Sequence, residues 1–149
     1  MRLTLLVAAA VAAECVAALT FPAFAQIADV IKARKAGFKV METARKPIKP
    51  MLQGVLAFDL KVVQAVLATI VEQSAKQKDL FGDDTKTGDT DALPIVWEKK
   101  ADFLARFDKL SADAKAAQAS IKDEATFKAE WGKVNSNCAG CHKVYQKRS

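Results

Sequence analysis

The stretch FKAEWGKVNSNCAGCHKVY, residues 127–145, decides the fold of this chain. Its apolar and sulfur-bearing side chains recur at alternating intervals of four and three residues, at Phe127, Trp131, Val134, Cys138, Cys141 and Tyr145. Because an α-helix completes a turn in about 3.6 residues, these intervals keep the side chains on one helical face. The stretch therefore predicts an amphipathic helix that packs its apolar stripe against other helices in a bundle.

Three upstream segments repeat this helical spacing. The first starts at Gln26, the second runs from about Leu60 to Leu80, and the third runs from about Pro94 to Gln118. Their inward stripes hold Ile27, Ile31, Arg34, Phe38, Met41 and Ile48, then Leu60, Val63, Leu67, Ile70 and Val71, then Phe103, Phe107, Leu110, Ala114 and Ala117. No segment reads as a strand, so the chain is predicted to be all-α, an up-down-up-down antiparallel four-helix bundle.

The ends of these helices carry recognisable signals. Pro47 and Pro50 are expected to bend or end the first helix, because proline removes a backbone donor. Asp59 and Ser120 are the predicted N-caps of the second and fourth helices, since short polar side chains accept hydrogen bonds from free backbone N–H groups. The polar run 82–91 lacks the spacing and the closing glutamate of a calcium-binding EF-hand loop, so it is predicted to be a solvated loop.

Length and composition exclude other classes. A chain of 149 residues has the size of one ordinary domain. Only 6 Gly and 4 Pro argue against a turn-rich all-β sandwich, and 51% hydrophobic residues argue against a disordered chain. The 23 Lys and Arg exceed the 17 Asp and Glu, and the formal net charge of +6 suits an acidic partner.

Residues 1–25 have the pattern of a secretory signal peptide. Arg2 precedes an apolar run, and the small-x-small triplet 23–25 is a cleavage site. The alternative is a membrane anchor, but Glu14 interrupts the run of about 20 apolar residues that a span needs. We therefore predict cleavage, export to the periplasm, and a mature domain over residues 26–149 with no membrane span.

The segment Cys138-Ala139-Gly140-Cys141-His142 fits the pattern for covalent attachment of a c-type haem. Two thiols add across the two vinyl groups of one porphyrin, and the histidine that follows supplies an imidazole nitrogen to the iron. The small residues between the cysteines let the macrocycle lie close to the backbone. The motif predicts one covalent haem c per chain, attached to Cys138 and Cys141, with His142 as an axial ligand.

Other roles for these two thiols have less support. A thioredoxin-like disulfide belongs to a βαβ context, which the sequence lacks. A zinc site needs four ligands, but the predicted mature chain offers one His and no further Cys. Two free buried thiols would be a liability in an exported protein.

The residues alone do not decide which ligand, if any, occupies the second axial position of the iron. Methionine is the other common axial ligand of cytochromes, and the predicted mature chain offers Met41 and Met51. Ligation by either gives a six-coordinate, low-spin electron carrier, whereas ligation by neither leaves a five-coordinate, high-spin iron with a vacant face. Arg34 lies on an apolar stripe, where a buried cation needs a partner, and a guanidinium binds a haem propionate in a two-pronged geometry.

Taken together, these features resemble the cytochrome c′ family, the class II c-type cytochromes. The resemblance covers essentially residues 26–149, and it rests on the C-terminal position of the haem motif, the stretch Val30–Met41, and Gly54, Phe58-Asp59, Trp97 and Trp131-Gly132. Cytochromes c′ are up-and-down four-helix bundles, and family members often dimerise through their first helices, which this sequence permits.

The resemblance also implies roles for single residues. Phe38 is expected to face the vacant axial position, and because phenylalanine cannot ligate iron, the site is expected to be open but crowded. Arg34 and Lys35 are expected on the propionate side, and Met41 and Trp97 in the haem pocket. One departure stands out: the family commonly has Arg or Lys four residues after the axial histidine, where this chain has neutral Gln146.

The function expected from these features is the binding of small gases, NO and CO, at an apolar distal face. Electron transfer is the rival function, with Lys143, Lys147 and Arg148 placed to attract an acidic redox partner in the periplasm. No acid–base pair on the distal stripe supports peroxidase-like turnover, so the chain is not expected to be an enzyme. Nucleic acid is not an expected partner of an exported protein.

Overall fold

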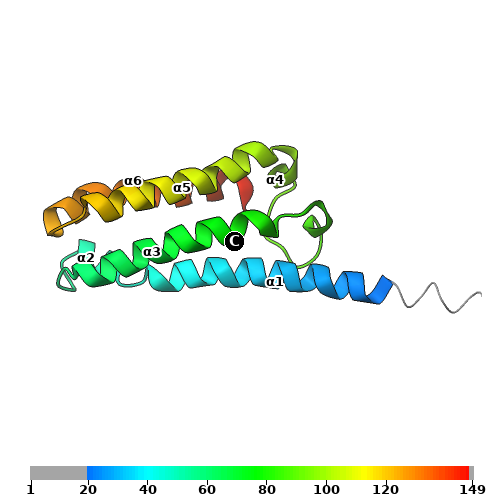
Figure 1. Cartoon of the computed structure of the whole chain (residues 1–149), viewed down its shortest axis with the longest axis horizontal. Helices are drawn as coiled ribbons and strands as arrows, with labels where there is room; N and C mark the ends of the chain where they lie inside the picture. The colour runs from blue at the N-terminus through cyan, green and yellow to red at the C-terminus, as the bar shows by residue number, and fades with distance from the viewer. Residues whose placement is uncertain (1–19, 148–149) are drawn as a thin grey trace, which may run out of the picture.

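In the part of the chain that the structure describes, the fold consists of four long helices: α1 (Thr20–Ala44), α3 (Leu60–Gln77), α5 (Lys100–Ser120) and α6 (Glu124–Tyr145). They run alternately in opposite directions along one axis (Figure 1). The computed structural model describes residues 20–147. The connections contain α2 (Ile48–Leu52), α4 (Ile95–Glu98) and the 3₁₀ turns η2 (Lys78–Leu80) and η3 (Asp83–Thr85). The predicted all-α, up-down-up-down bundle is confirmed.

Most of the predicted signal peptide lies outside the described residues. Its last residues fall in the first turns of α1, where the side chain of Phe24 is 73% exposed. Cleavage after Ala25 would fall within the first turns of α1, and it stays a prediction. Within residues 20–147, no helix is long and apolar enough to cross a membrane.

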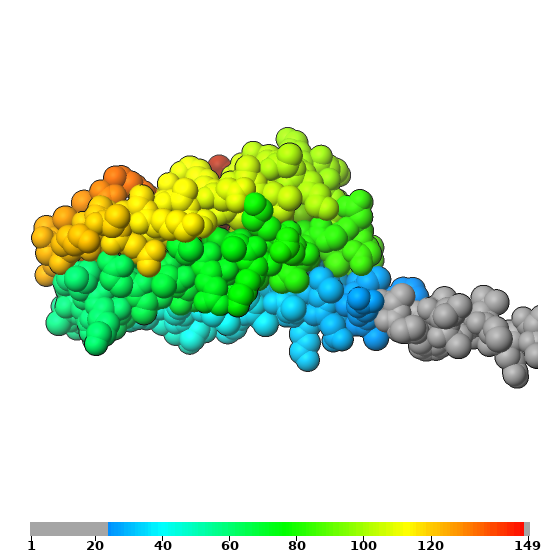
Figure 2. Space-filling model, viewed as in Figure 1, coloured from blue at the N-terminus to red at the C-terminus, as the bar shows by residue number. Residues whose placement is uncertain are grey.

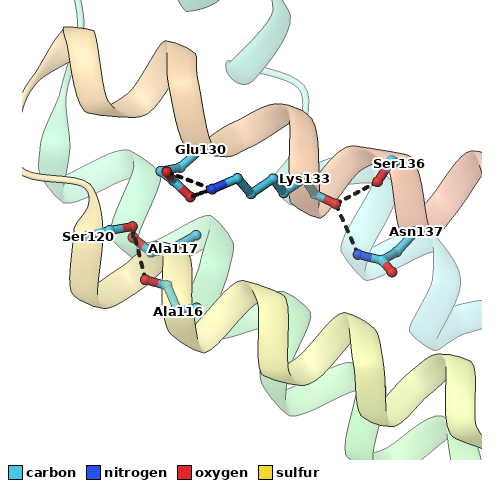
Figure 3. A network of polar contacts seen from close by, with 7 residues as sticks. All are labelled: Ala116, Ala117, Ser120, Glu130, Lys133, Ser136 and Asn137. Atoms are coloured by element: carbon cyan, nitrogen blue, oxygen red, sulfur yellow. Dashed lines mark hydrogen bonds and ion pairs between the residues drawn. The ribbon is translucent and has the colours of Figure 1, made fainter.

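Of the two N-caps predicted from the sequence, the structure confirms one and replaces the other. The carboxylate of Asp59 accepts a hydrogen bond from the Val62 N–H at 3.1 Å, as expected of an N-cap. Ser120, however, is the last residue of α5, and its hydroxyl donates back to the Ala116 carbonyl at 3.0 Å (Figure 3). Asp123 caps α6 instead, in a capping box with Thr126, because the link at Ile121 is fully buried and shifts the helix start.

The proline and tryptophan positions also refine the predicted helices. The first helix ends at Ala44, and Pro47 precedes the separate short helix α2. The predicted third helix is divided at Lys99, whose backbone leaves the helical region at φ −116° and ψ 42°. Trp97 therefore lies in the short helix α4 and does not open the long helix α5.

Three of the four lateral seams of the bundle are closely packed, and one is not. The backbone of α1 packs along α3, α3 along α5 and α5 along α6, whereas α1 and α6 approach each other at few points. Figure 2 shows the surfaces of α3 and α5 meeting along their length, with α1 beside α3. Space for a ligand is therefore expected between α1 and α6.

The core has two parts along the bundle axis. One cluster surrounds Phe127, Leu67 and Ile121, near the α2 end of the molecule. The second contains Phe81, Val96, Phe103, Phe107 and Tyr145, with Phe38 and Cys141 packed against it. The haem motif thus borders the more aromatic cluster.

A close approach of α1 and α3 holds the first helix in place. A Cβ atom on Gly37 would lie 2.0 Å from Nε2 of Gln77, so only glycine fits there without a shift. The same Nε2 donates to the Arg34 carbonyl at 3.1 Å, and Gln77 is completely buried. Gly37 and Gln77 therefore set the position of the α1 turn that carries Arg34 and Phe38.

The loop over residues 82–91 is largely exposed, as expected of a solvated loop, but two of its threonines dock on the bundle. Thr85 is 1% exposed and Thr90 is 9% exposed. Both accept hydrogen bonds from Arg34, while Lys147 donates through its N–H to Asp91 O at 2.8 Å and through Nζ to Thr90 O at 2.9 Å. The two threonines can be buried within this polar run because their hydroxyls accept hydrogen bonds from a buried donor.

Candidate haem site

A cavity of about 520 Å³ lies between α1 and α6, where the bundle is least closely packed. Cys138, Cys141 and His142 line it from α6, and Phe38 and Met41 line it from α1. Its volume falls in the range of roughly 300–1,000 Å³ that is usual for pockets of organic ligands. The structure therefore brings the complete attachment motif to the mouth of one suitable cavity.

The two thiols are free of a disulfide, and the imidazole is free to bind a metal. Cys138 and Cys141 are both half-buried and free, and burial raises the pKa of the Cys141 thiol. His142 is exposed by surface area, but burial of part of its ring and the charge of Arg45 lower its pKa. The imidazole is thus neutral at pH 7 and has a lone pair for a metal. Residues 20–147 hold no cluster of three His, Cys, Asp or Glu that would favour a zinc or calcium site.

The wall of the cavity is largely aromatic. The Phe38 and Phe107 rings are 6.3 Å apart between centroids, Phe107 and Phe103 are 5.3 Å apart, and Phe103 and Phe81 are 4.6 Å apart. The four rings belong to α1, α5 and the segment after η2. Such a wall gives a flat porphyrin a large apolar contact and excludes water from it.

Arg34 gives the clearest test of whether the cavity fits a haem. It is 3% exposed, lines the cavity, and lies 4.4 Å above the Phe81 ring centroid. Its guanidinium donates to Thr90 Oγ1 at 2.8 Å and to Thr85 Oγ1 at 3.3 Å, and no carboxylate pairs with it in the described part of the chain. A buried cation with only neutral acceptors is costly, and burial lowers its pKa. Glu42 and Asp91 line the cavity but neither pairs with Arg34, and a haem propionate would supply that partner, so the residues present fit a haem.

The other predicted pocket residues divide into those at the cavity and those behind it. Lys35 lines the rim and pairs with Asp89 at 2.7 Å. Met41 lines the cavity, whereas Met51 is 4% exposed within the first core cluster and does not line it. Trp97 lies behind the wall, where its Nε1 donates to the Gly82 carbonyl at 3.0 Å.

The structure also adds cavity residues that the sequence did not single out. Arg106 reaches the cavity from α5, Arg45 from the end of α1, and Tyr145 from the last turn of α6. Asn137 joins them, and its side-chain amide donates to the Lys133 carbonyl (Figure 3) and to Asp113. Tyr145 was visible as part of the inward stripe, but nothing in the sequence indicates that Arg106, the one arginine of α5, faces the haem motif.

The site combines two thiols and a neutral imidazole on one helix with an aromatic cavity and a buried arginine that has no carboxylate partner among the described residues. This combination defines a c-type cytochrome built on a four-helix bundle. Comparisons with known proteins agree. A family model described as cytochrome c′ matches residues 29–146. The chain is 52% identical over 119 residues to the cytochrome c′ of Rhodopseudomonas palustris, across 79% of this chain and 82% of that protein. It is 31% identical to a cytochrome c-556 of Agrobacterium tumefaciens, across 76% of this chain and 91% of that protein.

A solved structure makes the same assignment. The cytochrome c′ of Rhodopseudomonas palustris superposes with a TM-score of 0.80 at 51% identity, covering 81% of this chain and 98% of that one. The chain belongs to the cytochrome c′ family. It is therefore a c-type haem protein with covalently attached haem.

Proposed function

We propose that this cytochrome is a periplasmic protein whose haem iron is five-coordinate and high-spin, with His142 as its sole protein ligand. We further propose that it binds NO and CO at the face opposite His142 and also transfers electrons. The haem supplies the redox change and the free coordination position. The observation that carries the proposal is the position of Phe38, which presents a ring to the cavity from the helix facing the motif.

The cavity residues account for a preference among gases. Phe38 and its neighbour Phe107 offer no hydrogen bond to the negative charge that develops on bound dioxygen. NO and CO bind ferrous iron without such a donor. Each must displace the Phe38 ring, so the aromatic wall selects small and weakly polar ligands.

One observation favours a second candidate function. The thioether of Met41 lines the same cavity, one helical turn after Phe38. Ligation by Met41 would give a six-coordinate, low-spin electron carrier without a free position for gas. The basic side chains of Lys143 and Lys147 would attract an acidic redox partner in either case.

Absorption and resonance Raman spectra of the ferric and ferrous protein separate the two candidates. We expect high-spin spectra in both states, and a marked change when NO or CO is added to the ferrous protein. The matched variant is Met41→Leu, which removes the thioether at the cavity and should leave the spectra unchanged. Low-spin spectra that become high-spin in this variant would establish the six-coordinate electron carrier instead. A ferrous protein whose spectrum does not change when NO is added would overturn the gas-binding function.

A further inference from the structure

A cluster of polar residues on α5 and α6 holds the side chain of Arg106 beside the haem motif. Nε of Arg106 donates to Asp102 Oδ2 at 2.9 Å, and its Nη1 donates to the Gly140 carbonyl at 3.3 Å. The hydroxyl of Tyr145 donates to the same carboxylate oxygen of Asp102. The Arg106 guanidinium also lies 5.2 Å from the centroid of the Tyr145 ring. These four contacts, one of them to the residue before Cys141, define one position for the cation.

Arg106 lies at the rim between cavity and solvent: it lines the cavity, while its side chain is 36% exposed and that of Asp102 is 56% exposed. Arg106 and Tyr145 both line the cavity beside Cys141, and Tyr145 is only 3% exposed. The hydrogen bond from Tyr145 and then that from Arg106 hold the pKa of Asp102 below its usual range. The hydrogen bond to Asp102 raises the pKa of Arg106, so both charges persist at every physiological pH.

We propose that Arg106, held by Asp102 and Tyr145, raises the reduction potential of the haem, and that Asp102 opposes it. Reduction removes one positive charge from the iron centre, so a cation at the cavity favours the ferrous state and an anion favours the ferric state. Gln146, the C-cap residue that follows Tyr145, lines the cavity without a charge. The inference depends on the covalent haem, but not on whether the iron has five or six ligands.

The sign of the effect separates an electrostatic role from a structural one. In the holoprotein, we expect Arg106→Gln to increase the ferric-to-ferrous ratio by about threefold or more at the wild-type midpoint potential. Asp102→Asn should decrease that ratio, and the double variant should lie between the two. Arg106→Lys retains the charge and should keep most of the wild-type potential.

Lys109 provides a matched control on the same helix. It is paired with Asp113 at 2.6 Å and does not line the cavity, so Lys109→Gln should leave the midpoint potential unchanged. Spectroelectrochemical titration measures all five variants at one ionic strength. Equal shifts for Arg106→Gln and Lys109→Gln, or shifts of the same sign for Arg106→Gln and Asp102→Asn, would overturn the proposal. If Arg106→Gln fails to mature, Asp102→Asn decides alone, because an unchanged or lower potential in that variant also contradicts it.

Discussion

Replacing Phe38 with alanine tests whether this ring limits access to the iron. Under the proposed function, a ligand that enters the wild-type protein opposite His142 has to push the ring aside. That movement forces the side chain from its rotamer, at about 0.5–1.5 kcal/mol. It also separates the ring from Phe107, 6.3 Å away between centroids, at about 0.5–1.5 kcal/mol for an aromatic pair.

The two contributions sum to about 1–3 kcal/mol, and about 1.4 kcal/mol corresponds to a tenfold change in affinity. Phe38→Ala should therefore increase the affinity of the ferrous protein for CO by about 5- to 150-fold. CO titration gives the equilibrium constant, and flash photolysis gives the association rate, which should account for most of the change because the barrier lies on entry.

Phe58→Ala is the control for the loss of an aromatic pair elsewhere. The Phe58 ring lies 5.5 Å from Phe127, in the other core cluster, so its removal should destabilise the bundle without changing CO affinity. An unchanged CO affinity in Phe38→Ala, or an equal gain in Phe58→Ala, would show that the ring of Phe38 does not guard the iron.

Phe38→Met should place a thioether where the ring stands and convert the iron to a low-spin state, visible in the absorption spectrum; a spectrum that stays high-spin would contradict the assigned position of Phe38. Gly37→Ala should lower the free energy of unfolding by about 1–3 kcal/mol, because the new Cβ would lie 2.0 Å from Nε2 of the buried Gln77. Denaturant unfolding measures this, and a stabilised variant would refute the close contact. Hydrogen bonds from Thr126 lower the pKa of Asp123 from 3.8, so its contribution to stability is present above that pH and is lost as the pH falls through the lower folded value. Asp123→Asn should remove this part of the acid dependence of Tm, and identical pH profiles in the two proteins would argue against it.

Much of the site was predictable because its chemistry is local in the chain. The two cysteines and the histidine of the haem motif lie within five residues of one helix, so their spacing alone implies attachment and ligation. Arg34 was marked by its place on an apolar stripe, since a cation there requires a partner wherever the helix packs. The Asp59 cap was predictable for the same reason, because it depends only on the three residues that follow it.

Predictions failed where a distant contact decided between local options. Ser120 and Asp123 both have side chains that can cap a helix, and the burial of Ile121 selects Asp123. The run 82–91 is largely exposed as predicted, but its local sequence did not show that Arg34 binds two of its threonines, 51 and 56 residues away along the chain. Such contacts depend on how helices pack, which local spacing does not specify.

By itself, the sequence determined the helical class and the cofactor and predicted the residues that attach it, because helical periodicity and a five-residue motif are properties of neighbouring residues. Only the tertiary structure decided that α1 and α6 stay apart to form a cavity, that Met41 reaches it while Met51 does not, and that Arg106 is fixed beside Cys141. These features join residues from different helices, and their positions follow from the packing of whole helices against one another.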